Sequence, residues 1–98
     1  MKRGHQFRWA AFWFRMDNIT DLTDCKLVFY KDESNYASIA FESLVDEADE
    51  WFFIREKLGD FIKTGDFDWT EVNYVKIAVK HSSEQTYLFL VDELCFIE

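Results

Sequence analysis

Acidic side chains are the first residues in this sequence whose chemistry could be catalytic. Four of them fall in one short stretch, as Asp46, Glu47, Asp49 and Glu50. Glycoside hydrolysis needs two carboxyl groups that face each other across a cleft, about 5–10 Å apart. Four acids in a single loop do not predict that arrangement. The two histidines have no Ser or Cys partner at a recognisable catalytic spacing. We therefore expect this protein not to be an enzyme.

Aromatic side chains are the second group with usable chemistry, since they make up 19% of the chain. The apolar C–H face of a sugar ring stacks on an aromatic ring, while the sugar hydroxyls bond to polar side chains at defined positions. Trp9 and Trp13 fall on one face of an alternating segment, and Arg15 extends that row. Tyrosines flank the turn at 31–35, and one more lies opposite the face made by Val75, Ile77 and Val79. The predicted ligand-binding residues are Trp9, Trp13, Arg15, Tyr30, Tyr36 and Tyr74. The competing interpretation is that these side chains fill a core or an interface, as aromatic residues commonly do.

The elements that position these residues are predicted to be strands, because apolar and polar residues alternate with a period of two. Strands are predicted at residues 6–16, 25–31, 36–42, 51–57, 73–80 and 86–98. The last segment is nearly continuous in apolar character, so we expect it to be central in a sheet. In the loop before residue 73, Asp68 is expected to cap a helical turn and Trp69 to fill the end of the core. Six strands without a long helix favour an all-β antiparallel sandwich or barrel.

Composition limits the organisation and the partners of the chain. Its 98 residues, 49% of them hydrophobic, predict a single folded domain over 1–98. The net charge of −8 disfavours nucleic acid and anionic membranes as partners, because both are negatively charged. Cys25 and Cys95 are the two cysteines, and they are either two buried thiols or a disulfide between two strands.

The order of the segments resembles a known fold family. An aromatic strand that runs into Asp-Asn is followed by a turn with Asn-Tyr, a strand led by Trp51, and a Gly-x-Phe-Asp-Trp loop. The final strand carries Asp-Glu-Leu. The stretches that carry the likeness are FWFRMDNITDL (12–22), SNYASIAF (34–41), GDFDWTEVNYVKIAV (65–79) and LFLVDELCF (88–96). Together they resemble the jelly-roll β-sandwich of the galactose-binding-like superfamily, which includes many carbohydrate-binding modules and phage attachment modules.

The resemblance implies a function and two further features. It implies a non-catalytic carbohydrate-binding module of a glycan-active enzyme, a surface protein or a phage attachment protein, extracellular or virion-associated if the parent protein is exported. It implies a structural Ca²⁺, with Asp92 as the ligand on the last strand. The chain begins near where the third strand of the family would stand, so we expect an open sheet edge completed by a homo-oligomer or by a larger parent. The alternative function is a structural or assembly module, with protein–protein contacts through aromatic faces and open edges.

Overall fold

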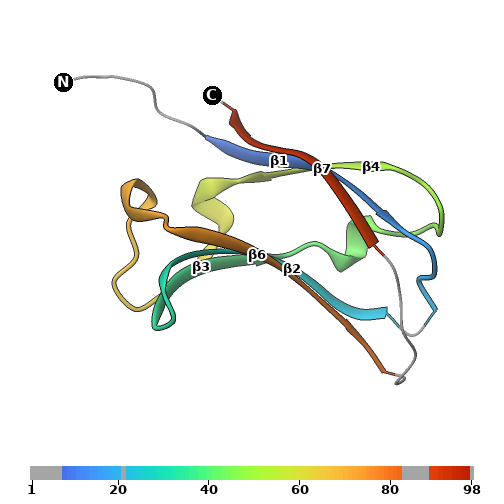
Figure 1. The fold of residues 1–98 in the computed structure, drawn as a ribbon, viewed down its shortest axis with the longest axis horizontal. Helices are drawn as coiled ribbons and strands as arrows, with labels where there is room; N and C mark the ends of the chain where they lie inside the picture. The colour runs from blue at the N-terminus through green and yellow to red at the C-terminus, as the bar shows by residue number, and fades with distance from the viewer. Residues whose placement is uncertain (1–7, 21, 83–88, 98) are drawn as a thin grey trace. The chain divides into compact units, whose positions relative to one another are not determined.

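The computed structural model describes residues 8–20, 22–82 and 89–97, and it is built from β-strands (Figure 1). Seven strands form two antiparallel sheets, and the described residues contain no α-helix. The strands are β1 (Trp9–Met16), β2 (Leu22–Asp32), β3 (Asn35–Ala40), β4 (Phe52–Lys57), β5 (Ile62–Thr64), β6 (Tyr74–His81) and β7 (Phe89–Ile97). Short 3₁₀ turns are η1 (Glu42–Leu44), η2 (Leu58–Asp60) and η3 (Trp69–Glu71). The two antiparallel sheets confirm the predicted all-β class, and their seven strands are consistent with a β-sandwich.

The six predicted strands are all present among the described residues, with several ends shifted, while residues 6–7, 86–88 and 98 of the predicted strands lie outside the described part of the chain. Strand β5 is the addition, and its three residues are all exposed, so it lacks the alternation that reveals a strand in sequence. The jelly-roll connection of the strands stays a prediction.

The chain divides into two compact units that alternate along the sequence. The first unit draws on Met1–Ile19, Leu44–Asp60 and Thr86–Glu98, and its sheet has the strand order β4-β1-β7. The second unit draws on Thr20–Ser43 and Phe61–Gln85, and its sheet has the order β5-β3-β2-β6. Neither unit is one continuous stretch of sequence, because the chain passes repeatedly from one unit to the other.

Strand β1 is the centre of the first sheet and separates an apolar face from an aromatic one. Ala10, Phe12, Phe14 and Met16 are fully buried. Trp9, Trp13 and Arg15 have the opposite parity and point to the outer face. Residues directly opposite each other in an antiparallel pair project to the same side. The outer face therefore continues over Phe53, Arg55 and Lys57 of β4, and over Leu90, Asp92, Cys95 and Ile97 of β7.

Strand β7 is an edge strand, which corrects the prediction that it is central. Its only hydrogen-bonded neighbour among the described residues is β1, and most of its side chains are exposed. The apolar run predicted a strand with a neighbour on each side, but among the described residues only one edge of β7 is paired. A bulge also interrupts β7, where Glu93 and Leu94 face the single residue Phe12. Glu93 occupies the left-handed region at φ 54°.

The second sheet has its apolar face built around β2. Cys25, Leu27 and Phe29 of that strand are buried, and their partners on β6 are Val79, Ile77 and Val75. The opposite face of the sheet is mixed, with Lys26, Lys76 and Lys80 beside Val28, Ile62 and the tyrosines. Strand β6, like β7, lies at an edge of its sheet.

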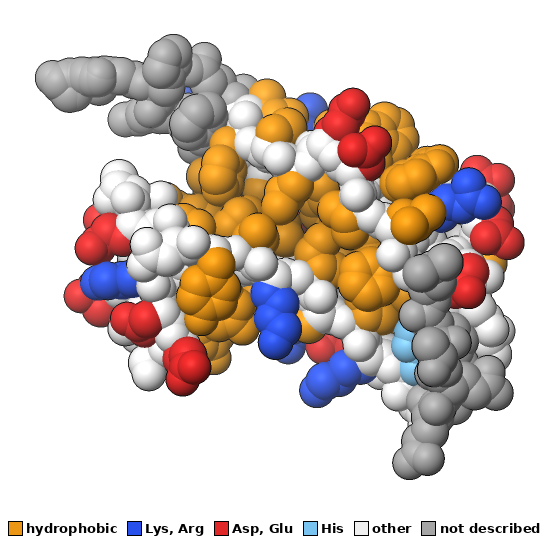
Figure 2. Space-filling model, in the orientation of Figure 1, with side chains coloured by type: hydrophobic (Ala, Val, Ile, Leu, Met, Phe, Trp, Pro, Cys, Tyr) orange, Lys and Arg blue, Asp and Glu red, His pale blue; other side chains and the backbone are white. Residues whose placement is uncertain are grey.

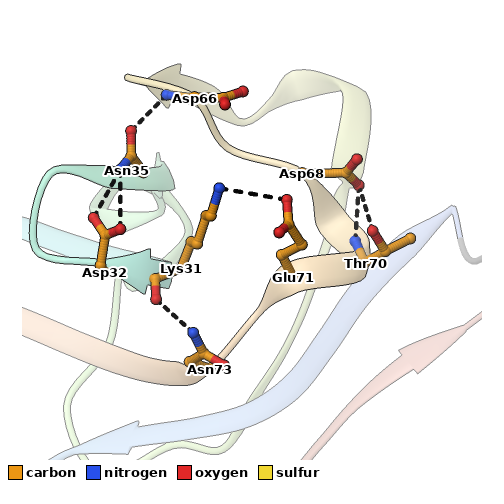
Figure 3. Close-up of polar contacts among 8 residues, drawn as sticks. All are labelled: Lys31, Asp32, Asn35, Asp66, Asp68, Thr70, Glu71 and Asn73. Atoms are coloured by element: carbon orange, nitrogen blue, oxygen red, sulfur yellow. Dashed lines mark hydrogen bonds and ion pairs between the residues drawn. The ribbon is translucent and has the colours of Figure 1, made fainter.

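The loop that leads into β6 is held by a cap and an aromatic cluster. Asp68 is the N-cap of η3, where its carboxylate accepts bonds of 2.9 Å from the backbone N–H and the hydroxyl of Thr70 (Figure 3). The Trp69 ring meets Phe29, Phe61 and Phe67 edge-to-face at centroid distances of 5.0–5.3 Å. The predicted cap is confirmed, and Trp69 packs as a structural residue rather than as an exposed platform.

Candidate functional site

The six predicted ligand-binding residues fall into two aromatic clusters on two sheets. Trp9, Trp13 and Arg15 share the outer face of the first sheet. The second sheet brings Tyr30, Tyr36 and Tyr74 together, because Tyr30 pairs with Tyr36 on one side and with Tyr74 on the other. The three tyrosines come from three separate stretches of sequence, and only strand pairing makes them one row.

The centre of the first cluster is a patch of exposed aromatic rings. Trp13 and Phe53 face each other across β1 and β4, with ring centroids 5.1 Å apart and planes at 50°. Their exposed fractions are 37% and 49%, and Trp51, with the same parity as Phe53, is 41% exposed. Aromatic side chains of this size usually gain free energy from burial, so two exposed rings on one sheet face, with a third at the residue before β4, favour contact with another molecule. We call Trp13, Trp51 and Phe53 the aromatic platform.

Polar groups flank the aromatic platform on both sides. Arg15 lies two residues along β1, where its guanidinium is 3.6 Å from the Asp49 carboxylate. The backbone N–H of Asp49 donates to the Met16 carbonyl at 2.8 Å, which fixes the loop against β1. Asp92 stands opposite Trp13 on β7 and is exposed. A donor and an acceptor thus border the rings.

The described residues do not provide further ligands that would complete a calcium site with Asp92. Calcium takes six to eight oxygen ligands, and in proteins several of these come from carboxylates. The described residues contain no group of three His, Cys, Asp or Glu side chains that could hold a metal ion. Asp92 also lies on an exposed edge strand, so its charge needs no metal to offset burial. The Ca²⁺ site stays a prediction.

Trp9 marks a second, cationic end of the same face. The guanidinium carbon of Arg55 lies 4.3 Å from the Trp9 ring centroid, and the Lys57 ammonium lies 5.5 Å from it. Both are cation–π distances, so the ring holds the two cations in place. An open depression of about 490 Å³ adjoins them, lined by Arg8, Trp9, Lys57, Leu58 and Gly59. Trp9 therefore acts as an anchor for positive charge, where the sequence had suggested a stacking surface.

The tyrosine row is more self-contained. Tyr30 and Tyr74 stack at 4.7 Å with planes 11° apart, and Tyr36 meets Tyr30 at 5.3 Å. Partial desolvation raises the pKa of the Tyr74 phenol, and the nearby charge of Glu33 adds to this. Because the Tyr30 ring is engaged by both neighbours, the row offers a ligand less free ring surface than the aromatic platform.

The loops beside the tyrosine row are tied together by polar contacts (Figure 3). The Asn35 amide donates to both carboxylate oxygens of Asp32, at 2.8 and 3.0 Å, and its oxygen accepts from the Asp66 backbone N–H at 2.6 Å. Asn73 donates to the Lys31 carbonyl at 2.6 Å, and the Lys31 ammonium is 3.5 Å from Glu71. The bonds that Asp32 accepts lower its pKa. The largest effect comes from the Asn35 amide, and the next from the backbone N–H of Ser34, which donates to the carboxylate at 2.9 Å. The carboxylates of Asp32 and Glu71 therefore have structural partners.

Sequence reasoning missed the half of the site that lies on β4 and at the residue before it. Trp51, Phe53, Arg55 and Lys57 were not among the predicted ligand-binding residues. Their signal was present, because WFFIREK alternates and places these four side chains on one face. What the sequence lacked was the register Trp13↔Phe53 and Trp9↔Lys57, which joins this face to that of β1.

The two cysteines are both free, which excludes a disulfide between them in this structure. Cys25 is buried, and this burial, with the nearby acids Glu42 and Asp24, raises the pKa of its thiol to about 12. Cys95 is exposed on the outer face of β7, so the interpretation of two buried thiols is wrong for this residue.

Comparison with protein-family models, curated proteins and solved structures finds no match for this chain. The resemblance to the galactose-binding-like superfamily therefore stays a prediction from sequence. No helix in the described part of the chain is long and apolar enough to cross a membrane.

Proposed function

We propose that this protein is a non-catalytic carbohydrate-binding module whose site is the outer face of the β4-β1-β7 sheet. One observation supports this above the others. Trp13 and Phe53 are exposed on one face of a sheet, with the exposed Trp51 just before β4 and with Arg15 and Asp92 at their borders. A rigid sheet that presents aromatic rings between a hydrogen-bond donor and an acceptor suits a sugar, which is apolar on its ring face and polar at its edge.

Each group in the site has a separate task in this proposal. The Trp13 and Phe53 rings take the apolar C–H face of a sugar and exclude water from it. The Asp92 carboxylate accepts bonds from sugar hydroxyls. Arg15, held by Asp49, keeps further N–H donors for the sugar oxygens. Because no residue is asked to transfer a proton or to attack a carbon atom, the outcome is binding without turnover.

The test is calorimetric titration after a glycan-array screen, with four forms of the full chain. The Trp13→Ala and Phe53→Ala variants should each weaken binding of any array hit by about tenfold or more, equivalent to ~1.4 kcal/mol. Ile62→Ala removes an exposed apolar side chain from β5 in the other unit and should leave the affinity unchanged. Tyr74→Ala tests the tyrosine row. Binding that survives Trp13→Ala but is lost in Tyr74→Ala would move the site to the second sheet, and silence across the array would refute the proposal.

A second function, assembly of copies of this chain, is favoured by the open edge of β7. Leu90, Val91 and Phe96 are large apolar side chains exposed along this strand. Hydrophobic side chains also reach the surface in several places on the face drawn in Figure 2. The chain has no proline, the residue that often blocks edge pairing. A second copy that pairs with β7 would extend the β4-β1-β7 sheet and cover these side chains.

Light scattering across a range of protein concentrations tests this assembly. The average mass should rise with concentration, and Val91→Lys should hold the chain at monomer mass, since an edge lysine disfavours strand addition. A constant monomer mass in the unsubstituted protein would exclude the assembly function and leave sugar binding untouched.

A further inference from the structure

The cationic end of the outer face recognises a negative charge, and we infer that the sugar bound there is anionic, a glycan whose rings bear carboxylate or sulfate groups. This inference rests on the proposed carbohydrate-binding function and names the class of its ligand. The inference depends on one arrangement of side chains. Exposed aromatic rings are followed, on the same strands, by Arg55 and Lys57, which lie over the Trp9 ring next to the depression.

Charged side chains are distributed unevenly over the first sheet. The outer face of its three strands carries three cations, Arg15, Arg55 and Lys57, with Asp92 as its acid and Glu93 beside it in the bulge. The cations at the Trp9 end come from β4, and both acids come from β7 on the other side of β1. Strands are about 4.8 Å apart, so β4 and β7 lie roughly 10 Å from each other. The outer face of β4 is therefore locally positive in a chain whose net charge is −8, because the acid of this strand, Glu56, lies opposite the buried Ala10 and has the inward parity.

A local positive region matters more to a bound group than the net charge does. Charges further away than the Debye length, about 8 Å at physiological ionic strength, are largely screened. Arg8 also lines the depression and adds a fourth cation. A carboxylate or sulfate placed there meets cations at close range, and the acids nearest to the lining residues in sequence are Glu56 of β4 and Asp60 of η2.

The two β4 cations are oriented before a ligand binds. A flexible Lys or Arg loses side-chain entropy when a ligand immobilises it. Here the Trp9 ring already holds the Arg55 guanidinium at 4.3 Å and the Lys57 ammonium at 5.5 Å. The guanidinium edge can then present two parallel N–H donors to one carboxylate or sulfate. Part of the ordering cost is met before the ligand arrives.

The aromatic platform and the cationic end of the outer face are too far apart for one sugar ring. Trp9 and Trp13 are four residues apart on β1, and at ~3.3 Å per residue they are separated by roughly 13 Å. A single sugar ring is too short to cover both, so the ligand that uses the whole face is an oligosaccharide. One ring stacks on Trp13 and Phe53, and a ring further along the chain places its anionic group at Arg55 and Lys57. The depression of about 490 Å³ is within the ~300–1,000 Å³ usual for ligand pockets.

The experiment compares an acid with its own neutral ester. Oligogalacturonides and their fully methyl-esterified forms are titrated into the full chain by calorimetry at low salt. A sulfated neutral oligosaccharide of similar length forms a third arm, and single-stranded oligo(dT) a fourth. The acid should bind at least about tenfold more tightly than its ester, and added salt should shrink that ratio because the discriminating contact is ionic. The sulfated arm shows which anionic group is preferred, and binding of either group that depends on Arg55 and Lys57 supports the inference.

Matched charge variants assign the preference to the Trp9 end. Arg55→Gln with Lys57→Gln should bring the affinity for the acid down to that for the ester. Lys76→Gln with Lys80→Gln lowers the net charge equally on β6 and should preserve the ratio of acid to ester. Arg55→Lys keeps the charge but loses the paired donors, so an intermediate ratio is expected. The substituted side chains are exposed, and an unchanged unfolding midpoint would show that each variant is folded.

Three outcomes overturn the inference, and they separate it from the proposed function. Equal binding of acid and ester leaves carbohydrate binding standing and removes the anionic preference. Absence of binding to every oligosaccharide refutes both. Oligo(dT) that binds as tightly as the acid would show a general polyanion surface in place of an anionic-sugar site.

Discussion

Gly65 occupies a backbone position that an alanine cannot share without displacing its neighbours. Its φ is +73°, in the left-handed region that L residues with a Cβ rarely adopt. A Cβ added at Gly65 would fall on the Asn35 side-chain oxygen and the Ser34 carbonyl oxygen, far inside van der Waals contact. The same Asn35 oxygen accepts the Asp66 N–H at 2.6 Å, so Gly65→Ala would push apart a contact that joins two loops (Figure 3).

The cost of Gly65→Ala can be built from three contributions. The left-handed conformation costs a residue with a Cβ about 1–2 kcal/mol. Loss of the bond between Asp66 and Asn35 costs about 0.5–1.5 kcal/mol. The smaller entropy of the unfolded alanine chain offsets about 0.4–1 kcal/mol. The expected loss of unfolding free energy is therefore about 2 kcal/mol, which lowers Tm by roughly 8–16 °C for a domain of this size.

Urea unfolding followed by tryptophan fluorescence measures this loss, and Gly59→Ala is the matched control. No atom lies within 4 Å of a Cβ built at Gly59, and its φ is not positive. The control should keep or slightly raise the stability, by up to about 1 kcal/mol. If Gly65→Ala unfolds within ~0.5 kcal/mol of Gly59→Ala, the reasoning about this loop is refuted.

Two further predictions concern titration and thiol reactivity. Folding lowers the pKa of Asp32 and Asp68 below the usual 3.8, because N–H and hydroxyl donors favour their ionised forms. Their stabilisation is complete above pH 3.8 and is lost as the pH falls through the lowered pKa, so Asp32→Asn with Asp68→Asn should flatten the fall of Tm below pH 3.8. An undiminished fall in that variant would contradict this. A thiol reagent at pH 8 should label Cys95 rapidly in the folded chain, and Cys25 only after denaturation, because burial raises the pKa of the Cys25 thiol to about 12. Equal labelling of both thiols before denaturation would show that Cys25 is accessible.

Much of the fold could be read from the sequence because strand formation leaves a local signal. The alternation in β1 and β6 gave both the elements and their faces, and the Asp68 cap followed from a carboxylate placed before a helical turn. The position of a strand in its sheet leaves no such signal. An apolar run such as that of β7 reports hydrophobicity alone, and the run lies at an exposed edge.

The candidate site was predictable where its residues share one strand, and not where they are joined by strand pairing. Trp9, Trp13 and Arg15 were predicted as one row because they share a strand, and the structure places them so. Phe53, Arg55 and Lys57 enter through pairing across β1 and β4, which depends on contacts between distant parts of the chain. The role of Trp9 as an anchor for cations follows from that pairing and could not be read from β1 alone.

The pairing of β1 with β7 also governs how the protein can fold. Trp9 is paired with Ile97, almost the full length of the sequence away, whereas β2 and β3 are joined by a tight turn. Closing so long a loop costs chain entropy before any contact repays it, and such topologies fold slowly. The β2–β3 hairpin can form early and locally, while one edge of the aromatic strand β1 must wait for β7 and only its other edge can pair earlier, with β4. A nascent chain would keep that edge of β1 unpaired until β7 has been synthesised, and that interval is when it is most prone to aggregation.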